Sequence, residues 1–143
     1  MKSTRTSFVA AALFSLATFA WGHDDATLDK AAGPHGGQLR MASIYHYELV
    51  VAPASAEARK APVTVYVTDH AGTKVATAGA TGTVTILSGP SKASIVLQPT
   101  GDNAMQGEGS YKSAADMKAI VAITLAGKSA EQARFTPLAG NRP

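Results

Sequence analysis

Residues 33–51 read Gly-Pro-His-Gly-Gly-Gln-Leu-Arg-Met-Ala-Ser-Ile-Tyr-His-Tyr-Glu-Leu-Val-Val. Most of the large apolar and aromatic side chains fall on odd-numbered positions of this stretch, whereas Arg40, His46 and Glu48 fall on even-numbered ones. Alternation with a period of two is typical of a β-strand with one buried face. The run is long enough for two strands, with a break expected at Ala42-Ser43. The residues that we expect to build the core are Leu39, Met41, Tyr45, Tyr47, Leu49 and Val51.

Short strand patterns between turn signals continue along the rest of the chain. Residues 62–68 alternate valine with threonine and tyrosine, and residues 82–87 and 118–125 are rich in β-branched side chains. Further strands are expected at 74–80, 93–98, 104–107 and 131–136. Seven or eight short strands without a long helical pattern predict an all-β domain, specifically an immunoglobulin-like β-sandwich, with a closed barrel as the alternative.

The N-terminus has the layout of a secretory signal peptide. A basic start with Lys2 and Arg5 precedes the apolar run 8–19, which is too short to span a bilayer. Small residues then offer cleavage after Gly22 or, alternatively, after Ala20. We therefore expect a periplasmic protein whose mature chain has no transmembrane segment.

The expected domain organisation follows from this processing. A signal peptide at 1–22 is followed by a flexible lead-in at 23–36. The β-sandwich domain is expected at 37–138, and a short C-terminal tail at 139–143. The mature chain has a length that suits one small domain.

Composition excludes several classes of function. Two of the 13 basic residues lie in the signal peptide, so the net charge falls from +3 to near neutral in the mature chain. Without a basic run, the chain offers no electrostatic footprint for nucleic acid. The absence of cysteine excludes disulfides, thiolate metal sites and a cysteine nucleophile. Common hydrolase and nucleotide-binding signatures are also missing, so we do not expect an enzyme.

Three stretches of the chain are distinctive. They read Gly-Pro-His-Gly-Gly-Gln-Leu from residue 33, Tyr-His-Tyr-Glu-Leu-Val-Val from residue 45, and Val-Tyr-Val-Thr-Asp-His-Ala-Gly-Thr from residue 65. Together with residues 78–82 and Arg134-Phe135, they resemble small exported proteins associated with heavy-metal efflux. A similar module looks to be present in periplasmic adaptor subunits of resistance-nodulation-division metal pumps.

This resemblance implies a non-enzymatic periplasmic domain that works beside a metal exporter. Its partners would be an efflux-pump adaptor or other metal-resistance components. The long coiled-coil heptads and paired lipoyl-like halves of a full adaptor are missing from the sequence. A stand-alone module is therefore the form that the resemblance favours.

His35 is the first candidate metal ligand. Pro34 fixes the backbone before it, and Gly36-Gly37 lets the chain turn directly after it. This setting presents an imidazole at an exposed turn, and imidazole is a common metal ligand. In the alternative interpretation, proline and glycine shape the turn while His35 only covers the edge of the core.

His46 and Glu48 form the second candidate group. They lie two positions apart on one strand face, roughly 7 Å from each other. One copper or zinc ion is within reach of both side chains if their rotamers converge. Alternatively, Glu48 orients His46, pairs with Arg40, or simply lies with His46 on a solvated sheet face.

Weaker candidates lie elsewhere. Asp69 and His70 occupy an expected hairpin tip, where both are ordinary turn residues. If the signal peptide is cleaved after Gly22, His23 carries both a free amine and an imidazole, which together chelate Cu(II). Met41 is expected in the core. Nothing in the spacing of Met105 and Met117 indicates a thioether site.

The leading functional hypothesis is an accessory protein of copper, zinc or cobalt resistance that binds or buffers the metal through histidine and carboxylate. The first alternative is a metal-independent interaction module that docks onto an efflux adaptor. The second alternative is a copper carrier that uses an N-terminal histidine.

Overall fold

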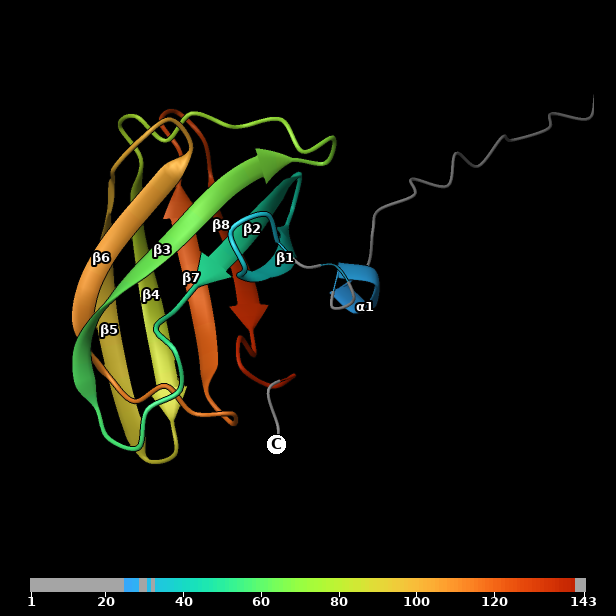
Figure 1. Ribbon diagram of the computed structural model, residues 1–143. Helices are drawn as coiled ribbons and strands as arrows, with labels where there is room; N and C mark the ends of the chain where they lie inside the picture. Colours follow the sequence, from blue (N-terminus) through green and yellow to red (C-terminus); the bar gives the residue numbers. More distant parts are fainter. Residues whose placement is uncertain (1–24, 29–30, 32, 141–143) are drawn as a thin grey trace, which may run out of the picture.

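Eight antiparallel strands form one nearly closed sheet in the computed structural model, which describes residues 25–28, 31 and 33–140 (Figure 1). The strands are β1 (Gln38–Ala42), β2 (Tyr45–Val50), β3 (Arg59–Asp69), β4 (Thr81–Ser88), β5 (Ser91–Pro99), β6 (Ala104–Tyr111), β7 (Lys118–Thr124) and β8 (Ala130–Phe135). A one-turn helix, α1 (Asp25–Leu28), contacts β1. None of the helical residues in the described ranges forms a segment long and apolar enough to cross a membrane.

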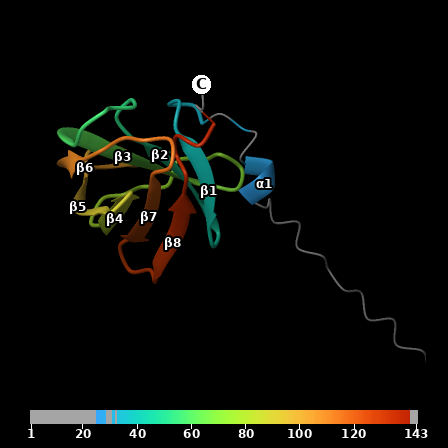
Figure 2. The ribbon, with the colours of Figure 1, turned by 90° about the horizontal axis from the view of Figure 1, so that it is seen from below.

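The strand order is β1-β2-β3-β6-β5-β4-β7-β8. Seen from below, the strands surround a common interior, and β1 and β8 lie next to each other (Figure 2). Side chains of β1 bridge this junction: Arg40 Nε donates to Arg134 O at 3.1 Å, and Thr136 N donates to Gln38 Oε1 at 2.8 Å. The all-β prediction is therefore confirmed, whereas an immunoglobulin-like sandwich in particular is not established.

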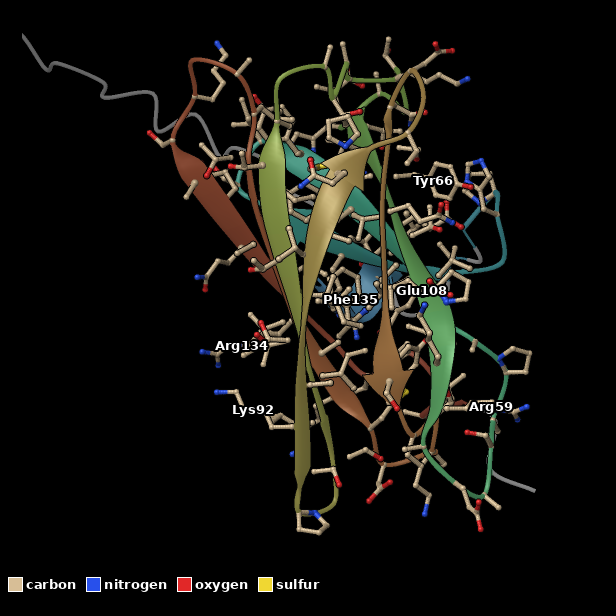
Figure 3. The ribbon with its side chains drawn as sticks, turned by 90° about the vertical axis from the view of Figure 1, so that its left-hand side faces the viewer. Arg59, Tyr66, Lys92, Glu108, Arg134 and Phe135 are labelled. Atoms are coloured by element: carbon tan, nitrogen blue, oxygen red, sulfur yellow. The ribbon has the colours of Figure 1, made fainter. Side chains whose placement is uncertain are left out.

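The core fills the interior of this sheet and is built by alternate residues. Figure 3 shows Phe135 in the interior, between Tyr66 and Arg134, which point outward on opposite sides. The predicted facing of β2 and β3 is confirmed, because the large core residues of both strands lie at odd-numbered positions, and β1 ends at Ala42, where the break was predicted. The fully buried residues of these two strands are Tyr47, Leu49, Val63, Val65 and Val67.

In β1, however, the predicted alternation is wrong. Leu39 and Met41 are only half-buried and lie outside the core cluster, while Arg40 and Ala42 are buried. The reason is the two-residue turn between β1 and β2, which pairs Ala42 with Tyr45. Directly opposed residues share a face of the sheet, so even positions of β1 lie with odd positions of β2.

The strand predicted at 74–80 is also wrong. Only Lys74 forms an isolated bridge, with Thr68, and the chain then turns. Gly79 has a positive φ of 74°, and the buried hydroxyl of Thr77 donates to Ala104 O at 3.0 Å. A side chain–backbone contact thus replaces the strand ladder here.

Two buried tyrosines differ in their hydrogen bonding. Among the described residues, Tyr47 Oη has no hydrogen-bond partner. Tyr111 Oη donates to Pro62 O and accepts from Ala52 N, both at 2.9 Å. Burial is the largest cause that raises the pKa of each hydroxyl above its ordinary value, and for Tyr47 the charge of Glu131 is the second.

We expect Tyr47→Phe to raise the free energy of unfolding by about 1 kcal/mol, because the variant removes a hydroxyl that is buried without compensation. Tyr111→Phe is the matched control. It should lower the free energy of unfolding by about 1–2 kcal/mol, because two backbone groups lose their partner. Urea unfolding at neutral pH measures both. A clear loss of stability in Tyr47→Phe would contradict this assignment.

The same pair predicts a dependence on alkaline pH. The unfolded chain releases tyrosine protons near pH 10, whereas the folded chain retains them to higher pH. The contribution of the two protonated hydroxyls to the free energy of unfolding is therefore fully present below about pH 10 and is lost as the pH rises above it. Tyr47→Phe should lose less stability than the wild type over this alkaline range.

Candidate functional site

The outer face of β2 and β3 collects most of the candidate residues. The register places Glu48 opposite Tyr66 and His46 opposite Thr68. Because the odd positions of both strands are buried in the core, these four side chains leave the sheet on the other face. Even so, His46 and Glu48 are buried, so other parts of the chain cover them.

Glu48 is covered by the loop at residues 33–37. Glu48 Oε1 accepts hydrogen bonds from the backbone N–H groups of His35 and Gly37, at 2.8 and 3.0 Å. Glu48 Oε2 lies 2.7 Å from His35 Nδ1. Only 3% of the Glu48 side chain is exposed, against 40% of the His35 side chain. We call this arrangement the Glu48 clamp, because both carboxylate oxygens hold the loop.

Glycine allows the loop to approach this closely. A Cβ at Gly33 would overlap the Glu48 carboxyl group, and a Cβ at Gly37 would lie 2.5 Å from Leu49 O. The loop also places the His35 ring flat on Tyr66, with ring centroids 3.6 Å apart and an interplanar angle of 6°. Residues 33–36, predicted as part of a lead-in, are thus packed against the sheet.

His46 contacts a different histidine. His46 Nε2 lies 3.1 Å from His70 Nδ1, and the two rings are nearly perpendicular, with centroids 4.7 Å apart. His70 follows the last residue of β3 and is exposed. One imidazole can donate a proton to the other, or both nitrogens can face a metal ion; we call these two residues the histidine pair.

Asp69 holds the turn that carries His70. Asp69 Oδ1 accepts from the N–H groups of Ala71 and Thr73, at 2.9 and 2.8 Å. The hydrogen bond from Thr73 is the largest cause that lowers the pKa of the Asp69 carboxyl below its ordinary value. The carboxylate of Asp69 thus has a structural part in placing the imidazole.

The candidate ligands are therefore divided into two pairs. His35 meets Glu48, and His46 meets His70, but within the described ranges no three His, Asp or Glu side chains converge as a metal-binding group. His23, the signal peptide and both cleavage positions lie outside the described residues.

The proposed pairing of Arg40 with Glu48 is not supported by the register. Arg40 lies opposite Tyr47 and shares its face of the sheet, whereas Glu48 leaves the other face. Arg40 instead donates to Arg134 O and Leu39 O.

The sequence did not predict two of these contacts. Tyr66 was assigned only a strand position, although its ring stacks on His35. His70 was given only as a weaker metal candidate on a turn, and its contact with His46 was not predicted. The β2–β3 register would have revealed both, because it places them directly opposite or diagonal to Glu48 and His46.

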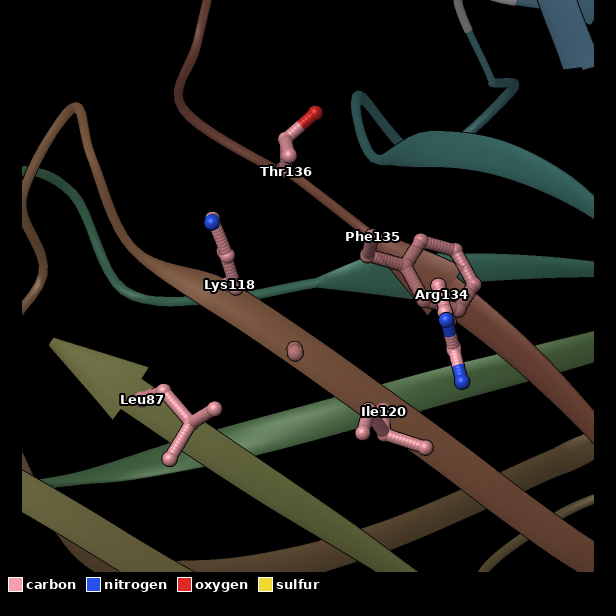
Figure 4. Close-up of a pocket in the computed structure, with 7 residues that line it drawn as sticks. Leu87, Lys118, Ile120, Arg134, Phe135 and Thr136 are labelled. Carbon is pink, nitrogen blue, oxygen red and sulfur yellow. The ribbon is translucent and has the colours of Figure 1, made fainter.

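A pocket of about 250 Å³ lies on another side of the molecule, between β4, β7 and β8 (Figure 4). Leu87 and Ile120 line it, and Lys118 and Arg134 stand beside it. It contains no imidazole or carboxylate, and none of the predicted site residues lines it. It is therefore separate from the outer face of β2 and β3.

Comparisons with known protein families, curated proteins and solved structures found no match to this chain.

Proposed function

We propose that this protein is a non-enzymatic periplasmic accessory of heavy-metal resistance or efflux, and that it binds or buffers a transition-metal ion at the histidine pair. The observation that carries the proposal is the separation of 3.1 Å between His46 Nε2 and His70 Nδ1. Metal–imidazole bonds are about 2.0–2.1 Å long, so two nitrogens on one tetrahedral ion lie about 3.3 Å apart. A small movement of the exposed His70 would adapt the pair to an ion.

The Glu48 clamp has a different part in this proposal. Both oxygens of Glu48 are already used by His35 and Gly37, so binding a metal there would require the loop to release the carboxylate. We therefore propose His46 and His70 as the ligands, and His35 and Glu48 as the pair that holds the covering loop in place.

The resemblance to efflux-associated proteins supports the same face. Its three stretches, which begin at residues 33, 45 and 65, supply the covering loop, β2, and the end of β3 with its turn. Contacts between His35 and Glu48 and between His46 and His70 join these stretches in space. Docking onto an efflux adaptor is the partner role that we propose for the module.

Titration with Cu(II) and Zn(II) tests the metal site. His46→Ala and His70→Ala should each weaken metal binding at least tenfold, because the one imidazole that remains cannot chelate the ion. His35→Ala should change the affinity by less than threefold, because its ring contacts Glu48 and Tyr66. Competition with a chromophoric chelator at neutral pH measures all four proteins.

Two results would contradict the assignment. Equal, negligible binding by all four proteins would remove the metal role and leave the metal-independent adaptor module. If His35→Ala lost the metal while His70→Ala retained it, the site would lie at His35 and Glu48 instead.

Acid should release the metal, because a ligating imidazole must be neutral.

A further inference from the structure

We propose that Met41 is a third ligand beside the histidine pair and that the site thereby selects Cu(I) over Zn(II). This inference rests on the proposed function, since it presumes that His46 and His70 hold a metal ion. It adds a third ligand of a different chemical kind, a thioether sulfur. This ligand in turn indicates which metal the site binds.

The register of β1 and β2 places Met41 next to the pair. Met41 lies directly opposite His46, so the two side chains leave the same face of the sheet. Opposed residues have Cβ atoms about 4.5–5.5 Å apart, which is within reach of a long, flexible methionine. His70 lies diagonally across β3 on the other side of His46 and already contacts its ring. Met41 and His70 thus lie on either side of His46, and the three residues form one group of candidate donors.

Met41 does not lie in the core, unlike the other described methionines. The two-residue turn of the β1–β2 hairpin reverses the alternation, so Met41 lies on the outer face and is only half-buried. Met105 and Met117, by contrast, are fully buried in the core. Among the described methionines, Met41 is therefore the one whose sulfur can meet a metal ion at the surface.

The donor set decides the metal. Thioether sulfur is a soft ligand that favours Cu(I), whereas Zn(II) in proteins is bound by thiolate, imidazole and carboxylate. The chain has no cysteine. Within the described ranges, no third His, Asp or Glu completes the pair. A thioether added to two imidazoles therefore raises the affinity of the site for Cu(I) strongly and its affinity for Zn(II) only slightly.

Met41→Leu provides the test, because leucine keeps the volume and removes only the sulfur. Anaerobic titration with Cu(I) against a chromophoric competitor should show affinity at least tenfold below that of the wild type. The Zn(II) affinity of the same variant should stay within threefold. His70→Ala is the matched control and should lower the affinities for both metals.

X-ray absorption of the Cu(I)-loaded protein provides a second, independent measurement. We expect a sulfur atom bound to copper in the wild type and none in Met41→Leu. If Met41→Leu keeps both its Cu(I) affinity and the wild-type absorption spectrum while His70→Ala loses the metal, the inference fails and the proposed function stands. If neither variant changes the binding of any metal, the proposed function fails first.

Discussion

Gly107→Ala is expected to lower the midpoint of thermal unfolding by roughly 10–15 °C, which corresponds to about 3 kcal/mol of stability for a domain of this size. Gly107 lies in β6 opposite Val63, where β5 crosses close by. A Cβ there would overlap the carbonyl oxygen of Val96 and lie 2.7 Å from Ile95 Cγ2. Because a backbone atom blocks the space, a side-chain rotation cannot relieve the overlap.

Gly101→Ala is the matched control in the same β5–β6 hairpin. A Cβ at Gly101 would meet only Ala104, at 4.0 Å. Its effect should stay within about 0.5 kcal/mol. Scanning calorimetry compares the two variants with the wild type. Equal midpoints for Gly107→Ala and Gly101→Ala would show that β5 and β6 do not approach as closely as described.

Glu48→Ala is expected to release the loop at residues 33–37 and to lower the free energy of unfolding by about 2–4 kcal/mol. The variant loses the bonds from the N–H groups of His35 and Gly37 and the contact with His35 Nδ1. Hydrogen bonds to a charged group contribute about 1.5–3 kcal/mol each, and they do not add fully. Amide hydrogen exchange at His35 and Gly37 should become fast, and urea unfolding gives the global effect.

Glu57→Ala is the control for the loss of a carboxylate, since Glu57 is exposed and its substitution should change stability by less than about 0.5 kcal/mol. Metal affinity separates the two possible roles of Glu48. In the role proposed here, Glu48→Ala keeps its affinity within threefold. If it lost the metal but kept exchange protection at His35, Glu48 would be a ligand and not a clamp.

The alternation in residues 45–50 and 62–68 predicted β2 and the middle of β3, because buried valine, leucine and tyrosine side chains in a strand repeat every second position. The same rule failed in β1. A two-residue turn offsets the alternation, and the length of a turn cannot be inferred from alternation alone. Leu39 and Met41 were therefore assigned to the wrong face.

The site was harder to predict than the strands. The sequence indicated His35 as one candidate ligand and His46 with Glu48 as a separate group. It did not indicate that Glu48 would meet His35, because that contact depends on how a loop folds back over β2. His70 was undervalued because it lies 24 residues after His46 in the chain, and their contact depends on the register between β2 and β3.

An anomalous-difference map from crystals soaked with copper or zinc tests the central claim most directly. We expect the strongest anomalous peak between His46 Nε2 and His70 Nδ1, about 2 Å from each nitrogen. A peak between His35 and Glu48, or no peak on the outer face of β2 and β3, would contradict the account.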